Sequence, residues 1–168
     1  MNTAHHELFL LRHGKAEQQY HGSDFERNLT ETGCVRTSNI ANYMREHKLL
    51  PDIIVSSSAK RAIATANIVC DIFSINTNLI NTRADLYAAE SDDVLTIIQQ
   101  LPETVERVLL VGHNPAFEIL VEQLVSNSAE NIHLSPSSMA RLAFTTRWSD
   151  LAAGQCQLLA IVHAQDIA

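Results

Sequence analysis

The chain has 168 residues, of which 46% are hydrophobic and 18% are charged, which excludes an intrinsically disordered protein. This length suits one hydrophobic core, so we expect a single domain over residues 1–168. The formal net charge is −7, from 12 Lys and Arg against 19 Asp and Glu, and we therefore expect no binding to nucleic acid, which needs a basic face. Because cations are scarce, any cluster of arginine and histidine is informative.

Cysteine usage and hydropathy bear on the compartment. The three cysteines, Cys34, Cys70 and Cys156, are widely spaced and predict neither a disulfide framework nor a zinc motif. The early apolar run over 8–11 is too short for a secretory signal or a membrane span. We therefore expect a cytoplasmic protein with free thiols and no membrane contact.

The first predicted strand covers residues 7–11 and ends in Arg12, His13 and Gly14. Ligands of α/β proteins bind beyond the carboxyl ends of strands, where an arginine offers a fork of donors to an anion and a neutral imidazole can act as a nucleophile. Gly14 allows a sharp turn or a close approach to a ligand. Since three residues can match by chance, this motif alone favours a structural explanation.

A polar loop over residues 15–29 follows, and its Arg27 either reaches a bound anion or is simply solvated. Thr30 is a good N-cap for the next helix, whose ending we assign to the segment 49–51 because Pro51 cannot continue it. Four residues at helical spacing (i, i+3, i+7 and i+10) predict the buried face of this helix: Cys34, Thr37, Ala41 and Met44.

The second predicted strand, residues 52–55, leads through three serines into a helix with Lys60 and Arg61 in its first turns. Serine hydroxyls such as that of Ser57, backbone N–H groups and Arg61 would together form an anion cradle at the helix N-terminus. A plain serine-capped helix with a surface arginine explains the same residues, and this motif alone favours it.

The remaining elements repeat the pattern. A third strand lies around 79–81, and Ser91 is the expected N-cap of a helix that ends at Pro102. A buried strand over 108–111 ends in a second glycine–histidine pair, Gly112-His113, followed by Asn114 and Pro115 as the cap and first position of a helix. Two further strands, 139–145 and 157–162, have no helix between them and should pair antiparallel or flank the sheet edge.

Four strand–helix units followed by strands predict an α/β fold, a three-layer α/β/α sandwich with a mainly parallel sheet and helices on both faces. The arginine and histidine motifs then meet at one edge of the sheet.

In this order the motifs resemble the histidine phosphatase superfamily, which includes the phosphoglycerate mutases. They are Leu-Arg-His-Gly at 11–14, Ser-Ser-x-x-x-Arg-Ala at 56–62 and Val-Gly-His-Asn-Pro at 111–115. The compact length, Leu-Thr-x-x-Gly at 29–33 and Leu-Tyr-x-Ala at 86–89 are most similar to its SixA branch, the phosphohistidine phosphatases. Asn28 and Ser58 stand where relatives often have proline, and neither change removes a reactive group. The resemblance implies a phosphoglycerate mutase-like fold without a large cap insertion.

The resemblance also implies roles. His13 would be the nucleophile and become phosphorylated, while Arg12, Arg61 and His113 hold the phosphoryl oxygens. Water would then hydrolyse the phosphohistidine. The cations replace a metal in this scheme, so we expect no metal and no cofactor.

The sequence does not decide which residue would act as the general acid. Larger relatives use a glutamate before the third helix, for which Glu90 is the nearest candidate, with Asp85 and Asp92 behind it. Glu90 is equally well explained as a solvated loop residue. An imidazole leaving group, whose conjugate acid has a pKa of about 6.5, needs little or no acid catalysis.

Only 52 positions separate Arg61 from His113, too few for a capping subdomain. We therefore expect a phosphatase acting on a phosphohistidine of a partner protein, such as a phosphotransfer domain of a two-component relay, with phosphate or sulfate binding in the pocket. A phosphatase of small phosphate monoesters is the alternative within the superfamily, and a mutase is disfavoured without a cap. An inactive phosphate-binding or scaffold module is a further alternative, which the presence of both histidines and both arginines disfavours.

Overall fold

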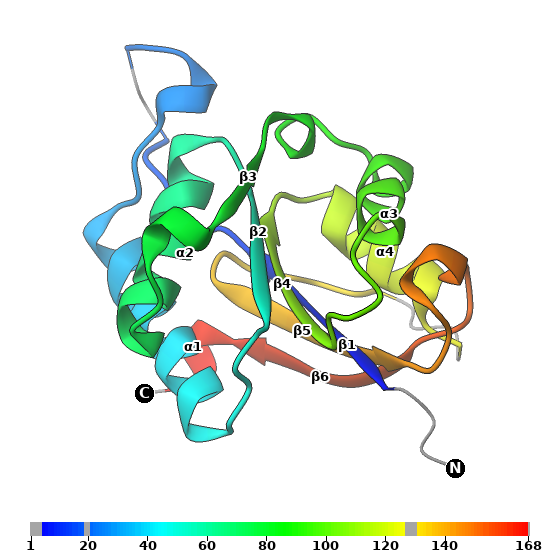
Figure 1. Ribbon diagram of the computed structural model, residues 1–168. Helices are drawn as coiled ribbons and strands as arrows, with labels where there is room; N and C mark the ends of the chain where they lie inside the picture. The colour runs from blue at the N-terminus through cyan, green and yellow to red at the C-terminus, as the bar shows by residue number, and fades with distance from the viewer. Residues whose placement is uncertain (1–4, 19–20, 127–130, 168) are drawn as a thin grey trace.

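The computed structural model describes residues 5–18, 21–126 and 131–167, which form a six-stranded sheet covered by helices (Figure 1). The strands are β1 (His6–Arg12), β2 (Ile53–Ser57), β3 (Asn81–Arg83), β4 (Arg107–Gly112), β5 (Ser138–Phe144) and β6 (Gln157–His163). The helices are α1 (Glu31–Glu46), α2 (Lys60–Phe73), α3 (Ser91–Gln99) and α4 (Ala116–Leu124).

The strand order is β3-β2-β4-β1-β5-β6. The first four strands of this order run parallel, with Leu8 opposite Val108 and Val55 opposite Leu110. β5 pairs antiparallel with β1, and β6 pairs antiparallel with β5. The predicted mainly parallel sheet with an antiparallel tail is therefore confirmed.

The apolar run of β1 is continuous because both faces of the sheet are covered. Leu8 and Leu10 belong to the core beneath α3 and α4, whereas Phe9 and Leu11 belong to the core beneath α1 and α2. Figure 1 shows the same division, with α1 and α2 on one side of the sheet and α3 and α4 on the other. The three-layer α/β/α sandwich is thus confirmed, and no large cap insertion interrupts it in the residues that the structure describes.

Three predicted boundaries, of two helices and one strand, differ from those in the structure. α1 ends at Glu46, before Pro51, because Lys48 adopts a left-handed backbone conformation with φ 58°. The segment 77–79 is a short 3-10 helix, so the third strand begins only at Asn81. The N-cap of α3 is Glu90 rather than Ser91.

The predicted cap of α4 was also wrong. Its N-cap is Pro115 rather than Asn114, because the Asn114 side chain donates instead to Glu118 Oε1 and to the carbonyl oxygen of Leu134.

In the described ranges, no helix is both long enough and apolar enough to cross a bilayer.

Candidate active site

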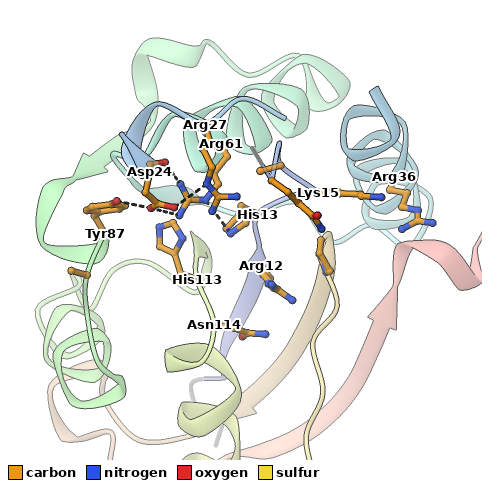
Figure 2. A pocket seen from close by; sticks show the side chains of 14 residues that line it. Arg12, His13, Lys15, Asp24, Arg27, Arg36, Arg61, Tyr87, His113 and Asn114 are labelled. Carbon is orange, nitrogen blue, oxygen red and sulfur yellow. Dashed lines mark hydrogen bonds and ion pairs between the residues drawn. The ribbon is translucent and has the colours of Figure 1, made fainter. Parts of the chain in front are cut away.

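One cavity lies at the edge of the sheet where β1 and β4 end and α2 begins (Figure 2). Its volume is about 670 Å³. It is lined by Arg12, His13, Lys15, Ala16, Gln18, Asp24, Arg27, Arg36, Arg61, Tyr87, Ala88, His113, Asn114 and Pro136. The two histidines and two arginines predicted from separate strand ends therefore share one cavity.

Close packing of two glycines holds the loop after β1 against α1. A Cβ on Gly14 would lie 2.7 Å from Thr37 Oγ1, and a Cβ on Gly33 would overlap the carbonyl oxygen of Lys15. Thr30 caps α1 by accepting from the Gly33 N–H at 3.0 Å, and its own N–H donates to the Lys15 carbonyl at 2.9 Å. The residues that follow His13 are thereby fixed relative to the helix.

The His13 ring is buried and its tautomer follows from its contacts. Nδ1 lies 2.8 Å from the carbonyl oxygen of Gly14, which only accepts, so Nδ1 carries the proton. Nε2 therefore carries the lone pair of the ring, and it accepts a hydrogen bond from Arg61 Nε at 3.3 Å. Burial, together with the nearby His113, Arg61 and Arg12, lowers the pKa of His13 to about 3, although the hydrogen bond to the Gly14 carbonyl opposes this shift. At neutral pH, His13 is an uncharged imidazole with the electronic form of a nucleophile.

His113 lies beside His13, with ring centroids 5.1 Å apart. Its Nε2 shares a hydrogen bond with Ser57 Oγ at 2.8 Å, and the same hydroxyl oxygen accepts from the Ala59 N–H at 3.2 Å. Burial and then the charge of Arg61 lower the pKa of His113 to about 4. Ser57 therefore positions His113 and the start of α2, and it does not line the cavity.

Arg61 is held by the loop between β1 and α1. Its Nη1 donates to the Asp24 carbonyl at 2.8 Å and its Nη2 to Asp24 Oδ2 at 3.1 Å. Asp24 also accepts from Tyr87 OH at 2.6 Å and from Arg27 Nε at 2.9 Å. The hydrogen bond from Tyr87 and then the charges of Arg61 and Arg27 lower the pKa of Asp24 to about 2. Asp24 is therefore ionised throughout the neutral range.

Arg12 is held on the opposite wall. Its Nη1 donates to the Leu134 carbonyl at 2.9 Å. Glu118 Oε1 fixes that segment by accepting from the Leu134 N–H at 2.9 Å and from Asn114 Nδ2 at 2.7 Å. Burial lowers the pKa of the Arg12 guanidinium, and the Glu118 carboxylate opposes this shift. The Nε of Arg12 is buried and has no hydrogen-bond partner in the described residues.

The candidates for a general acid do not reach the cavity. Glu90 is exposed at the N-terminus of α3, where its N–H donates to Asp93 Oδ2 at 2.9 Å. Asp85 forms an ion pair with Arg83, and neither it nor Asp92 lines the cavity. The simpler interpretation of Glu90, an exposed loop residue, fits the structure. Arg27 does reach the rim, tied to Asp24 and to the carbonyl of Glu17.

Sequence reasoning missed Asp24 and Tyr87, which organise Arg61. Tyr87 stood within the Leu86-Tyr87-x-Ala89 motif without an assigned role, and Asp24 lies three residues before Arg27. Pairing that acidic residue with an arginine of the same loop was the available signal. In the described ranges, no three His, Cys, Asp or Glu side chains are grouped so that they could hold a metal ion.

Comparisons with known proteins place these features in context. A family model described as "Histidine phosphatase superfamily (branch 1)" matches residues 8–87. The structure of a putative phosphohistidine phosphatase SixA from Nakamurella multipartitia is similar with a TM-score of 0.83 and 25% identity, over 95% of this chain and 96% of that one. A putative SixA from Agrobacterium tumefaciens has a TM-score of 0.79 and 29% identity, over 94% of this chain and 97% of that one.

A SixA structure complexed with tungstate shares the fold, with a TM-score of 0.81 and 24% identity over 95% of this chain and 98% of that one. A curated relative, the 2,3-bisphosphoglycerate-dependent phosphoglycerate mutase of Rhodococcus opacus, is 37% identical over 67 residues. That match covers 38% of this chain and only 27% of the mutase.

Proposed function

We propose that this chain is a histidine phosphatase, specifically a phosphohistidine phosphatase acting on a phosphorylated histidine of a partner protein; the family model that matches residues 8–87 and the similarity to the SixA structures support this. The residues that carry the reaction in this proposal are His13, Arg12, Arg61 and His113.

One observation carries the choice of substrate. Within the described residues, Asp24 is the one carboxyl group that lines the cavity, and its pKa of about 2 leaves it without a proton to donate at neutral pH. An alkoxide leaving group needs such a proton. An imidazole leaves without it, since its conjugate acid has a pKa of about 6.5. The cavity is therefore better suited to a phosphohistidine than to a phosphate ester.

The first step forms a covalent intermediate. The hydrogen bond from Arg61 Nε is released, Nε2 of His13 attacks phosphorus with the freed lone pair, and the bond from phosphorus to the substrate imidazole breaks in line with it. The substrate imidazole carries a proton on its other ring nitrogen, so the departing nitrogen keeps the electron pair of the broken bond and the ring leaves as neutral imidazole. The Nδ1–H bond to the Gly14 carbonyl keeps the ring oriented while Nε2 becomes phosphorylated.

Arg12, Arg61 and His113 act on the oxygens of the transferring group. The two guanidinium groups neutralise the charge that the phosphoryl oxygens carry in both steps. A bound phosphoryl dianion favours protonation of His113, which then donates a hydrogen bond to it. In the second step, water attacks phosphorus, the bond to His13 Nε2 breaks, and inorganic phosphate leaves.

The partner is inferred from access to the cavity. Between α2 and β4 the chain forms β3, α3 and their connections, with no large insertion over the site. A histidine on the surface of a folded protein can therefore reach His13. A phosphotransfer domain of a two-component relay presents such a histidine and is the partner class that we propose. The tungstate complex of SixA supports a tetrahedral oxyanion as the group bound.

The test compares substrates at equal enzyme concentration. Phosphate release is measured from a histidine-phosphorylated phosphotransfer domain, from phosphoimidazole, and from 3-phosphoglycerate and glucose 6-phosphate. We expect the phosphohistidine protein to give the highest kcat/KM. Preference for the two esters would assign the chain to small-molecule phosphatases, and binding of phosphate without any turnover would make it a scaffold module.

His13→Ala tests the intermediate. The variant should lose turnover and the acid-labile phosphoenzyme that the wild type forms with phosphoimidazole. His47→Ala is the matched control, because His47 is an exposed histidine at the end of α1 that stacks on Tyr43 outside the cavity. Wild-type activity in His13→Ala would reject the assignment.

A further inference from the structure

The cavity holds more positive charge than one phosphoryl group needs. Five of the twelve Lys and Arg side chains of this acidic protein line it. Arg61 donates to His13, Arg12 donates to the Leu134 carbonyl, and Arg27 is tied to Asp24 by an ion pair of 2.9 Å. The remaining two, Lys15 and Arg36, form no ion pair and no side-chain hydrogen bond within the described residues, so their charges are left for a ligand.

The backbone brings Lys15 and Arg36 to the same cavity. Gly33 packs directly on the carbonyl of Lys15, and the N–H of Thr30 donates to that same carbonyl at 2.9 Å. Arg36 follows Gly33 by three residues in α1 and so stands one turn along the same face. Figure 2 shows both side chains on the far side of His13 from Asp24 and Tyr87.

We propose that Lys15 and Arg36 form a second anion subsite, which binds carboxylate side chains flanking the phosphohistidine of the partner protein. This inference rests on the proposed function and specifies its substrate. The cavity, at about 670 Å³, is of the size that holds a drug-sized ligand, so it has room for side chains next to the phosphoryl group.

The chemistry of the two residues fits carboxylates. The guanidinium of Arg36 offers paired donors that match the two oxygens of a carboxylate, and the ammonium of exposed Lys15 adds a mobile point charge. The protein carries a net charge of −7, so an acidic partner is repelled at long range. A local pair of cations offsets this repulsion where the partner must dock and selects acidic over neutral flanks.

The test uses two peptides that carry a non-hydrolysable phosphohistidine analogue, phosphoryltriazolylalanine. Glutamates flank the analogue in one peptide, and glutamines replace them in the other. Dissociation constants are measured by fluorescence anisotropy at low salt. We expect the wild type to bind the glutamate peptide about fivefold to tenfold more tightly, since each exposed charge pair contributes modestly.

The double variant Lys15→Gln/Arg36→Gln should bind both peptides equally. Arg45→Gln removes an exposed cation from the far end of the same helix and should keep the wild-type preference. The preference of the wild type should also shrink as salt is raised to about 0.3 M, where screening is stronger. A double variant that keeps the preference would overturn the assignment of these residues.

Failure of the subsite and failure of the proposed function are distinguishable. Phosphate release from phosphoimidazole, which has no flanking groups, reports on the proposed function alone. A wild type that releases phosphate but does not distinguish the peptides keeps the function and rejects the subsite. A wild type that prefers the glutamate peptide but never releases phosphate keeps the subsite and rejects the phosphatase. Equal peptide binding, combined with pyrophosphate binding that the double variant loses, would assign the subsite to small diphosphorylated ligands.

Discussion

The two arginines on either side of His13 are held by different kinds of partner. Arg61 is buried, but its guanidinium pairs with the carboxylate of Asp24, whose side chain is 53% exposed. Arg12 pairs with the neutral carbonyl of Leu134, in a segment fixed by Glu118. The arginine of one wall is therefore bound by an exposed carboxylate, and the arginine of the other wall is bound by a backbone carbonyl.

This difference assigns the two walls different tasks. A phosphoryl dianion can replace the Asp24 carboxylate at Arg61, because both are anions and the carboxylate is open to water. The same dianion does not replace the Leu134 carbonyl, because Leu134 engages only Nη1 of Arg12, which also lines the cavity. We infer that the Arg61 wall exchanges ligands during turnover and that the Arg12 wall stays fixed.

The largest predicted effect comes from a substitution of Arg61. Arg61→Lys should lower kcat/KM for phosphoimidazole by about 10²- to 10³-fold, because lysine cannot bond His13 Nε2 and two Asp24 oxygens in one planar fork. Arg12→Lys should cost about tenfold, since one ammonium donor can still reach Leu134. Equal losses in the two variants would contradict the division of tasks.

The Arg12 wall should matter more for stability. Glu118→Ala removes the acceptor of Asn114 Nδ2 and the Leu134 N–H, leaving partly buried donors unpaired, and should lower the free energy of unfolding by about 2 kcal/mol. Asp24→Ala, on the exposed wall, should lower it by less than about 1 kcal/mol. Urea denaturation of both variants measures the difference, and the reverse order would refute it.

The chain order predicted the strand-end residues well. Arg12, His13 and His113 follow buried strands directly, and parallel strands deliver such residues to one edge whatever the details of the loops. Arg61 was placed correctly for the same reason, because a short connection from β2 fixes the first turn of α2. The fold and the centre of the candidate site were therefore within reach of pattern reasoning.

The side-chain contacts of these site residues could not be predicted from the sequence pattern. Asp24 and Tyr87 meet across 63 positions, and nothing in a polar loop shows which side chain turns inward. Ser57 was expected at the anion, but the imidazole of His113 takes its hydroxyl group. Glu90 was considered as an acid from its position before α3, yet that helix begins outside the cavity. Each error concerns a contact between segments whose relative orientation only the tertiary structure gives.

Histidine burial makes the stability depend on pH. The pKa of His113 is lowered to about 4 in the folded protein, so the unfolded chain binds its proton first as the pH falls below about 6.5. The contribution of His113 to stability should therefore be complete above about pH 6.5 and shrink toward about pH 4, by up to about 2 kcal/mol between about pH 7 and pH 5, and His13, whose pKa is about 3, adds a loss in the same direction. His113→Asn should show a smaller loss over this interval in urea denaturation. An unchanged pH dependence in that variant would contradict the lowered pKa.

The smallest predicted effect tests whether a phosphoryl group competes with the Asp24 carboxylate for Arg61. Asp24→Asn keeps the shape of the side chain and removes the charge that competes with a phosphoryl group, so inorganic phosphate should inhibit with a Ki lower by about threefold. Since the pKa of Asp24 is about 2, this gain should be constant across the neutral range. Asp85→Asn is the matched control, because Asp85 is an exposed carboxylate paired with Arg83 outside the cavity. A weaker affinity for phosphate in Asp24→Asn would mean that the carboxylate orders Arg61 for the ligand instead of competing with it.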